Sequence, residues 1–571
     1  MPKSKLWHIF PPLPSAADLE LHGYPPVMRQ ILYNRGYATR AAAHQYLQAL
    51  PLSDTAPLNM LGIATAVDRI EFAIRESEQI AVYGDYDADG VTATALLVQF
   101  LTRLGANARP YIPNRFDEGY GLNTDALTYL HEEGVRLVIT VDCGIRSPFE
   151  VEHGNQLGLD TIISDHHHPG PDLPRAMAII NPKQAGDDYP EKNLAGVGLA
   201  FKLAEGLWQH LDRKNSSDLA ILNHPEAYLD LVALGTITDL APLTGENRSL
   251  VRTGLQSIQQ PRRQGVAALV GVSGLTPINI TATDISFILG PRLNAAGRLE
   301  SALDSYQLLV TNDLHEAGLL AQKLENQNRD RQEITRKMQV RAEELAYAED
   351  PDPLLLLAVD PEFNPGVVGL VASRLTELHY RPSIVAYQGE DFFRGSCRSI
   401  PEFHITDALD QCADLLTHHG GHASAAGFTI RKDLFPEFIA RMRQVAYAEL
   451  AALDLRQTLT ADLVISLSDL KPEILDYQMW LQPTGYGNPQ AAFVSQGLKI
   501  LRSRAVGKDN AHLKFTVTDG HIIYDAIAFR QGEWQASLPT FVDLLYTFER
   551  NEFNGQTSLQ LNVRDLKPAE G

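Results

Sequence analysis

Three carboxylates stand within five residues in the segment Gly84-Asp85-Tyr86-Asp87-Ala88-Asp89-Gly90. Carboxylates this close repel one another, and nothing nearby in the sequence neutralises them. A hard divalent cation is the simplest explanation, because such ions take oxygen ligands. A solvated acidic turn is the alternative for this segment taken alone.

The same D-x-D-x-D-G pattern also opens the calcium loop of an EF-hand. That loop needs a bidentate Glu at its twelfth position, where this chain has Leu96, and a helix in front of it. Ile80 to Tyr83 is instead a short apolar run, which is typical of a buried strand. The pattern therefore disfavours an EF-hand.

Two later apolar runs also end in residues that bind metals. Leu137 to Val141 runs into Asp142, and Ile162 to Ser164 runs into Asp165-His166-His167-His168. Singly, each is better explained as a helix cap or a structural histidine. Together they would converge on one edge of a parallel sheet. Mixed carboxylate and imidazole ligands suit Mn²⁺, with Mg²⁺ possible and Zn²⁺ less favoured.

Asp239, in Thr238-Asp239-Leu240, is a fourth acidic candidate, although a capping or turn role fits it equally well. So many ligands indicate two cations rather than one. Two cations about 3.5–4 Å apart clamp the attacking and leaving oxygens of a phosphoryl group, and a shared carboxylate is their simplest arrangement. The spacing thus predicts metal-dependent hydrolysis of a phosphate ester or anhydride.

The elements that must position these residues alternate in type. Helix-like Ala64 to Arg75 precedes the strand at 80–83, and Val91 to Leu104 again has helical spacing. Short buried strands between helices predict a parallel α/β sheet. Ligands of such sheets bind beyond the carboxyl ends of the strands, where the acidic residues stand.

Beyond this sheet the pattern changes twice. Asp313 to Asp350 has apolar residues near helical intervals and predicts a helix roughly 50 Å long, a strut between domains. A second α/β unit follows, with strands at 354–359 and 383–387 around a helix at 367–379. The last hundred or so residues hold short β-rich runs that predict a small barrel or sandwich: 499–503, 512–517, 522–529 and 542–548.

The composition is that of an ordinary globular protein. The chain has 571 residues, 44% of them hydrophobic, which predicts about three to five domains. A formal net charge of −21 argues against a surface that coats nucleic acid throughout, but not against a local basic groove. The three cysteines form no metal or disulfide motif. With no signal peptide or long apolar stretch, we expect a cytoplasmic protein that does not bind membranes.

The acidic motifs resemble, in order, those of the DHH phosphoesterase superfamily, and within it most closely the RecJ family of bacterial single-strand-specific DNA exonucleases. Later segments resemble a further RecJ motif and motifs of the DHH-associated domain, and extend the resemblance over nearly the whole chain. These segments are Pro291 to Leu299, Gly366 to Ala372, Ser396 to Ser399 and Gly420 to His422.

The resemblance implies an α/β fold with a parallel-sheet DHH core, a long connecting helix, a second α/β DHH-associated domain and a C-terminal OB-fold β-barrel. The domain limits that follow are 1–50 for an N-terminal helical segment, 51–310 for the catalytic core, 311–350 for the connecting helix, 351–455 for the associated domain and 456–571 for the OB-fold.

The resemblance also implies roles for particular residues. Two Mn²⁺ or Mg²⁺ ions would be held by Asp85, Asp87, Asp89, Asp142, His166 and Asp239, with Asp142 bridging both. His167 would face the scissile phosphate, Asp165 would brace the site, and Asp85 would ligate or orient the first metal. Substrate contacts would come from Asn294, Arg298, Ser396, Arg398, Gly420, Gly421 and His422. The residues themselves add Arg115 and Tyr120, which stand in a predicted loop near the metal-binding edge and would clamp or stack on the terminal nucleotide.

The implied activity is 5′→3′ hydrolysis of single-stranded DNA to 5′-mononucleotides, in recombination, mismatch repair and base excision repair. The implied partners are single-stranded DNA, single-strand-binding protein and other recombination and repair proteins. Two alternatives stay open: a phosphodiesterase acting on cyclic dinucleotides or short oligonucleotides, and a non-catalytic DNA-binding or replisome-binding member of the superfamily.

Residues of the C-terminal domain favour a polymer over a small substrate. Lys499, Arg502, Arg504, Lys508 and Lys514 lie close together in the sequence, as in the basic groove of an OB-type barrel. Aromatic residues in the following strands either stack on bases or belong to the core, and for most of them the core is the better interpretation. They are Phe515, Tyr524 and Phe529.

Overall fold

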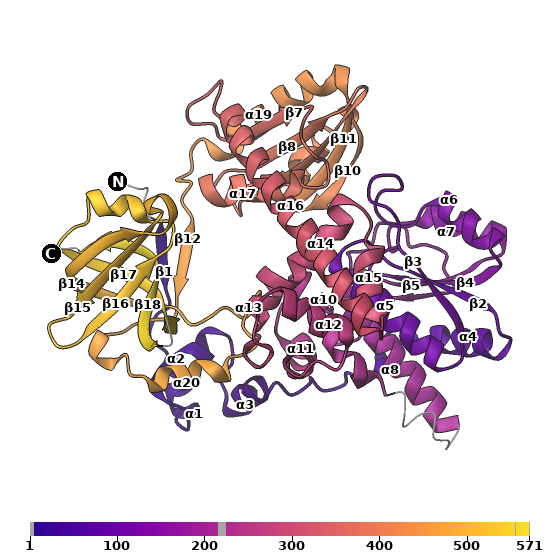
Figure 1. Ribbon diagram of the computed structural model, residues 1–571, viewed down its shortest axis with the longest axis horizontal. Helices are drawn as coiled ribbons and strands as arrows, with labels where there is room; N and C mark the ends of the chain where they lie inside the picture. Colours follow the sequence, from indigo (N-terminus) through magenta and orange to yellow (C-terminus); the bar gives the residue numbers. More distant parts are fainter. Residues whose placement is uncertain (1–4, 215–223, 554–555, 570–571) are drawn as a thin grey trace. The chain divides into compact units, whose positions relative to one another are not determined.

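The computed structural model describes residues 5–214, 224–553 and 556–569. The chain divides into two compact units (Figure 1). One comprises Met1–Ser53, Pro242–Arg252 and Arg456–Gly571, and the other Asp54–Ala241 and Thr253–Leu455. None of the helices that the described residues form is long and apolar enough to cross a membrane.

A parallel five-stranded sheet forms the core of the larger unit. Its order is β3 (Asn107–Tyr111), β2 (Gln79–Tyr83), β4 (Val135–Val141), β5 (Asp160–Ser164) and β6 (Ala178–Ile180). Helices cover both faces (Figure 1): α6 (Thr124–Glu132) and α7 (Pro148–Leu157) one face, and α4 (Ile63–Arg75), α5 (Ala88–Arg103) and α8 (Gly196–Lys214) the other. Burial on both faces explains why these strands are apolar runs without alternation. The parallel α/β core is therefore confirmed.

The predicted long helix is α16, Leu314–Ala346, which is continuous over 33 residues. Asp313 caps its start by accepting a hydrogen bond from the backbone N–H of Glu316. Its first half contacts α12 (Gln264–Val272), α14 (Gly290–Leu299) and α15 (Leu303–Val310). Its second half buries Met338 and Ala342 against α17 (Val368–His379) and β7 (Leu356–Asp360).

A second, mixed sheet lies in the same unit and confirms the second α/β domain. Its order is β10 (Leu416–His422), β11 (Ala425–Arg431), β9 (Phe392–Arg398), β8 (Ser383–Gln388) and β7. Strands β7 and β8 are parallel, and the remaining pairs are antiparallel. The face of this sheet away from its hydrophobic core presents the side chains of Ser396 and Arg398.

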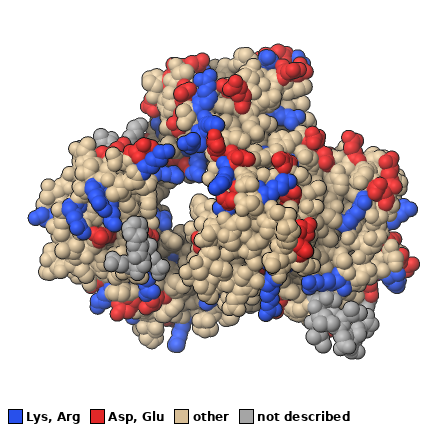
Figure 2. All heavy atoms as spheres, in the orientation of Figure 1, with Lys and Arg blue, Asp and Glu red and all other residues tan. Residues whose placement is uncertain are grey.

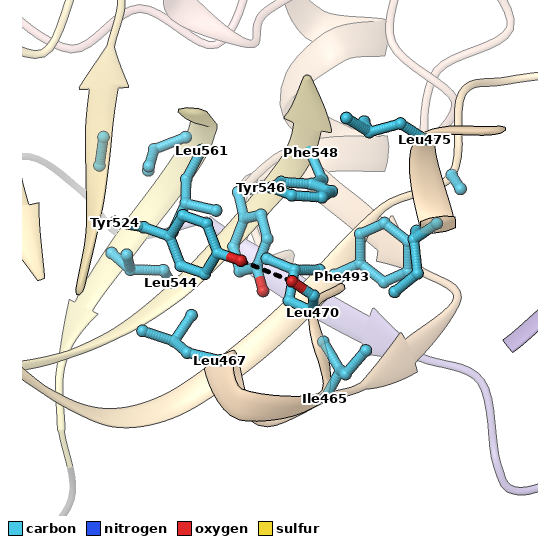
Figure 3. Packing of buried hydrophobic residues seen from close by; sticks show 14 of the residues in the cluster. Ile465, Leu467, Leu470, Leu475, Phe493, Tyr524, Leu544, Tyr546, Phe548 and Leu561 are labelled. Carbon is cyan, nitrogen blue, oxygen red and sulfur yellow. Dashed lines mark hydrogen bonds between the residues drawn. The ribbon is translucent and has the colours of Figure 1, made fainter. Parts of the chain in front are cut away.

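The smaller unit is built around a closed barrel, as the OB-fold prediction requires. The strands run in the order β14 (Phe493–Val506), β15 (His512–Thr518), β16 (Ile523–Ala528), β18 (Gln556–Pro568) and β17 (Phe541–Phe553), and β17 pairs back to β14. Figure 3 shows aromatic side chains filling its interior, where the hydroxyl of Tyr524 donates to the carbonyl of Leu470 at 2.6 Å. The C-terminal β-rich runs therefore form a barrel rather than a sandwich.

The N-terminal segment, for which no role was predicted, is part of this barrel unit. Strand β1 (Leu6–Ile9) pairs in parallel with β12 (Thr458–Ala461). Helices α2 (Pro26–Asn34) and α3 (Arg40–Gln48) bury apolar side chains in the same hydrophobic cluster as the barrel. Strand β1 and helices α2 and α3 thus complete a unit whose barrel is encoded more than 400 residues later. The domain limits given above stay a prediction.

Candidate metal centre and substrate-binding site

The polar residues that follow β2, β4 and β5 lie together at the carboxyl edge of the parallel sheet. The paired strand ends Val141 and Ser164 set Asp142 and the histidine run side by side. Ligand atoms within 4.8 Å of one another form three groups: Asp85, Asp87 and Asp142; Asp89, His166 and Asp239; and Asp142, His166 and His167. The structure therefore brings all six predicted metal ligands to one place.

The imidazole of His166 lies at the centre of these carboxylates. Its Nε2 is 3.1 Å from Oδ1 of Asp142, 3.8 Å from Oδ2 of Asp239 and 4.0 Å from Oδ2 of Asp89. Among the six predicted ligands, three buried atoms have no hydrogen-bond partner in the described part of the chain: Asp85 Oδ1, Asp142 Oδ1 and His166 Nε2. Buried acceptors without partners are costly, and divalent cations would satisfy all three. The oxygen-rich donor set with imidazole fits Mn²⁺ or Mg²⁺.

The first acidic cluster lies in a strand–loop–helix, not in a helix–loop–helix. Asp87 is the N-cap of α5, where its carboxylate accepts hydrogen bonds from the backbone N–H groups of Asp89 and Gly90 at 2.9 and 3.1 Å. Strand β2 precedes the cluster, so the structure excludes the EF-hand. Asp239 is the C-cap residue of α10 (Leu229–Thr238) and also reaches the metal groups.

The N-terminus of α8 holds Asp89 in place. The backbone N–H groups of Gly196 and Val197 donate to its two carboxylate oxygens at 2.6 and 2.8 Å. A Cβ at Gly196 would lie 2.7 Å from Cβ of Asp142, and one at Gly235 would lie 2.8 Å from Oδ1 of Asp89. Neither glycine could be recognised from the sequence, because only their spatial closeness to the carboxylates distinguishes them from other glycines.

The carboxylates are held in an environment that disfavours their charge. Burial, with the neighbouring Asp87, raises the pKa of Asp89 to about 7. Burial and adjacent carboxylates also raise the pKa values of Asp85, Asp142 and Asp239 well above their usual range. Burial lowers the pKa of His166 to about 3, so this imidazole is neutral and can offer a lone pair to a cation. These shifts are typical of a site that requires positive charge.

Asp165 braces His167 rather than joining the metal groups. Its Oδ1 accepts from the backbone N–H of His167 at 3.0 Å and lies 2.8 Å from Nδ1 of the same residue, while Oδ2 accepts from the N–H of Ile145. Burial alone would raise the pKa of Asp165, but the hydrogen bond with His167 and the imidazole charge lower it to about 2. The pKa of His167 is raised by the same contact against the opposing effect of burial. The hydroxyl of Tyr120 is 3.4 Å from the same His167 nitrogen.

Three arginines near the centre have no carboxylate partner among the described residues. Arg115 stacks on the ring of Tyr86 at 3.9 Å, and its Nε donates to the carbonyl of Gly297. Arg298 donates to the carbonyl of Gly366, and Arg398 to the hydroxyl of Ser373. Burial and the proximity of Arg115 lower the pKa of Arg298 to about 9. Cations left unpaired in this way are typical of an anion-binding site.

Two of the predicted substrate residues, Asn294 and Gly421, also have a structural role. Asn294 accepts a hydrogen bond at Oδ1 from the N–H of Ala88, so it braces the acidic loop. Gly421 has φ of +155°, and a Cβ there would lie 2.3 Å from the carbonyl oxygen of Ala425, so its hairpin requires glycine. Gly420, by contrast, faces open space.

A cavity of about 780 Å³ separates the metal edge from the second sheet. Its walls include Tyr120 and His167 on one side and Gly420, Gly421 and His422 on the other. Ser396 lies in register with Gly427 and Gly420, so this part of the sheet carries few bulky side chains. Four of the nine predicted substrate residues therefore line one cavity: Tyr120, Gly420, Gly421 and His422.

The barrel surface carries the expected basic residues, and two of its three candidate aromatics belong to the core, the interpretation favoured for most of them. Arg502 pairs with Thr516 and Arg504 with Lys514 across β14 and β15, and Figure 2 shows Lys and Arg on the visible face of the barrel. Phe515 and Tyr524 are buried in the core, where the apolar interior rather than a base contacts them. Phe529 is 52% exposed.

The sheet, its acidic edge and the second sheet together define a phosphoesterase of the DHH class. Residues 79–236 match the model of the DHH family, N-terminal domain, residues 352–448 match the DHHA1 domain and residues 461–565 match the RecJ OB domain. The single-stranded-DNA-specific exonuclease RecJ of Bacillus subtilis is 37% identical, over 95% of this chain and 68% of its own. The chain belongs to the RecJ family of single-stranded-DNA-specific exonucleases.

Solved structures of a relative agree with this assignment. RecJ of Thermus thermophilus in complex with Mn²⁺ has a TM-score of 0.86 at 32% identity, over 100% of this chain and 81% of that one. The same protein in complex with Mg²⁺ has a TM-score of 0.80 at 30% identity, over 100% and 80% of the two chains. The acidic groups described above could hold the same ions.

Proposed function

We propose that this chain degrades single-stranded DNA from its 5′ end to 5′-mononucleotides, using two divalent cations. The observation that carries the proposal is the buried group of carboxylates and imidazole with three orphaned acceptor atoms. Membership of the RecJ family and the similarity to relatives named single-stranded-DNA-specific exonucleases support the substrate. The direction and the mononucleotide product rest on the resemblance of the motifs.

We assign one cation to Asp85, Asp87 and Asp142 and the other to Asp89, His166 and Asp239, with Asp142 shared. Asp142 is the natural shared ligand because its Oδ1 has no other partner among the described residues and faces His166 of the second group. When bound, the cations supply a water of lowered pKa and stabilise negative charge on the departing oxygen.

The protein's own residues position the DNA and handle charge. Asp165 holds His167 by its Nδ1, which leaves Nε2 free to face the scissile phosphate. A raised pKa keeps more of this imidazole charged, so it can donate a hydrogen bond to a phosphate oxygen. Arg298 and Arg398, which lack carboxylate partners in the described part of the chain, would hold phosphates beside the cations.

The substrate residues of the two sheets would grip the terminal nucleotides in the cavity between them. Gly420 leaves space for a phosphate or sugar, and His422 supplies a donor beside it. Arg115 and Tyr120, from the loop before α6, would contact the terminal nucleotide. The barrel would hold the strand further along through Arg504 and Lys514, mainly by contact with phosphates.

Recombination, mismatch repair and base excision repair are the processes we propose for this activity, in the cytoplasm. Single-strand-binding protein and other repair proteins are the partners we expect. The resemblance alone supports these assignments.

One experiment separates the proposal from its main alternative. A long single-stranded DNA is labelled at the 5′ end in one sample and at the 3′ end in another, and both are incubated with Mn²⁺. We expect the 5′ label to appear at once as mononucleotide while the 3′-labelled strand shortens gradually, with duplex DNA spared. An intact strand alongside hydrolysed dinucleotides would overturn the substrate and favour a dinucleotide phosphodiesterase. The Asp89→Ala variant is the inactive control.

A further inference from the structure

The backbone of the histidine run after β5 is held at three consecutive carbonyls. The carbonyl of His166 accepts a hydrogen bond from Nζ of Lys183 at 2.5 Å. The carbonyl of His167 accepts one from Nδ2 of Asn181 at 2.8 Å, and that of His168 one from Nε of Arg146 at 2.8 Å. Side chains from two other loops thus fix the peptide planes that carry both functional imidazoles.

Asn181 and Lys183 act together from the loop that follows β6. Asn181 is completely buried, and its Oδ1 accepts the backbone N–H of Lys183 at 2.8 Å while its Nδ2 donates to His167. The same amide therefore sets the position of Lys183 and of the histidine backbone. Strand β6 is the last strand of the parallel sheet, so its carboxyl end lies beside the end of β5.

His166 needs this support more than His167 does. The ring of His167 is oriented by Asp165, which lies 2.8 Å from its Nδ1. Neither ring nitrogen of His166 makes a hydrogen bond within the described part of the chain, and its Nε2 is buried. A metal-binding imidazole usually has its second nitrogen hydrogen-bonded, which fixes the ring. Here the backbone contact from Lys183 takes the place of that bond.

We infer that Asn181 and Lys183 are positioning residues for the cation site: through the carbonyls of His166 and His167 they set where the two imidazoles point. The inference rests on the proposed function, which makes His166 a cation ligand. Loss of either donor leaves a partly buried carbonyl without its partner and lets the loop relax, so Nε2 of His166 moves away from Asp142 and Asp239.

Mn²⁺ binding tests this inference without measuring catalysis. The signal of free Mn²⁺ in electron paramagnetic resonance gives the dissociation constants of the wild type and of Lys183→Met, Lys183→Arg and Asn181→Ala. We expect Lys183→Met and Asn181→Ala to weaken Mn²⁺ binding roughly 10–100-fold, the usual effect of losing a residue that orients a ligand. Lys183→Arg keeps a donor at this position and restores most of the affinity.

Lys192→Met is the matched control. Lys192 lies in the same loop region and also donates to a backbone carbonyl, that of Asp187 at 2.7 Å, but not to the histidine run. We expect its Mn²⁺ affinity to stay within about twofold of the wild type, because the cation ligands keep their supports. Equal weakening in Lys192→Met would overturn the inference, because general loosening of the loop would then explain the effect.

Two further outcomes are decisive. Unchanged Mn²⁺ affinity in folded Lys183→Met and Asn181→Ala, with folding checked by circular dichroism, would overturn the inference. If Lys183→Met does not fold, Asn181→Ala and Lys183→Arg decide the result on the same criteria. A wild type that binds no Mn²⁺ would instead contradict the proposed function, so the two failures are distinguishable.

Discussion

Nε2 of His166 lies 3.1 Å from Oδ1 of Asp142, and neither atom has a hydrogen-bond partner among the described residues. The two side chains follow strand ends that are paired in register, Val141 with Ser164. The sheet therefore fixes two buried polar atoms side by side with no hydrogen bond to satisfy either, and a cation between or beside them would supply the missing partner.

Replacing Asp142 should lower the exonuclease activity and raise the free energy of unfolding of the metal-free protein. Asp142→Asn removes a buried carboxyl group whose ionisation its surroundings disfavour, so we expect the metal-free protein to gain about 0.5–2 kcal/mol in free energy of unfolding. Exonuclease activity should fall by at least about 10³-fold, because the shared ligand is lost. Chemical denaturation and the end-label assay measure the two effects. Asp68→Asn, at an exposed position, is the control, and a stability loss in Asp142→Asn would contradict the argument.

Glycine at position 196 should be essential, while glycine at 198 on the same helix should not. A Cβ at Gly196 would press on Asp142 at 2.7 Å, whereas one at Gly198 meets only the side chain of Leu194 at 3.4 Å, an ordinary contact. We expect Gly196→Ala to lower kcat about 10²-fold, the effect of a displacement of roughly 1 Å. Gly198→Ala should stay within a few-fold of the wild type. Similar rates for both variants would show that the contact does not matter.

Cation binding should release protons below neutral pH. The pKa of Asp89 is about 7 in the folded protein against an ordinary 3.8, so between these values the folded metal-free state binds more protons than the unfolded one. Its contribution to the free energy of unfolding therefore falls as pH rises from about 4 to about 7. Mn²⁺ needs the ionised carboxylate, so binding at about pH 6 should release protons and binding at about pH 8.5 fewer.

Calorimetric titrations in buffers of different ionisation enthalpy count these protons. Asp89→Asn should reduce the number released at the lower pH. Equal release at both pH values, or none at the lower one, would contradict the raised pKa.

Arg248 should be a main stabiliser of the barrel unit. Its fully buried guanidinium donates to five backbone carbonyls: those of Tyr46, Trp480, Leu481, Gln482 and Pro483. Arg248→Met leaves these acceptors unsatisfied, so we expect a loss above about 3 kcal/mol in the free energy of unfolding of this unit. The emission of Trp7, Trp480 and Trp534, all in this unit, reports its unfolding.

Arg252→Met is the comparison for that prediction. Arg252 lies on the same helix, α11 (Gly245–Gln259), and its Nη1 donates to the carbonyl of Leu47. We expect a smaller loss, about 1 kcal/mol, for a single contact of this kind. A similar midpoint of unfolding for both variants would show that the number of carbonyls held by Arg248 is not what stabilises the unit.

The sequence allowed the edge of the metal site to be predicted because every ligand except Asp239 follows an apolar strand, whereas Asp239 follows helix α10. The run Leu137 to Val141 locates its strand, and the strand locates Asp142. The roles of three other residues could not be predicted. Asn181 and Lys183 donate to backbone carbonyls, and Gly196 donates its own backbone N–H to Asp89. Every residue has a backbone carbonyl, so the residue types in the sequence do not show which carbonyl accepts such a hydrogen bond.

Packing between distant segments was equally hard to predict. Helix-like patterns near the N-terminus were visible, but an amphipathic helix does not reveal which core it completes. Leu32 and Tyr46 belong to the same hydrophobic cluster as Phe493 of the barrel, which is more than 400 residues away in the sequence. The pattern in β15 and β16 also left Phe515 and Tyr524 open to two interpretations, and only their burial assigns them to the core.

The central claim is that two cations bind at the carboxyl edge of the parallel sheet with Asp142 between them. Anomalous diffraction at the manganese absorption edge, from crystals of the full chain grown with Mn²⁺, tests it most directly. We predict two peaks about 3.5–4 Å apart, one beside Asp85 and Asp87 and the other beside His166 and Asp239, both in contact with Asp142. A single peak, or occupancy only at the separate group of Asp68, Glu71 and His210, would contradict the account.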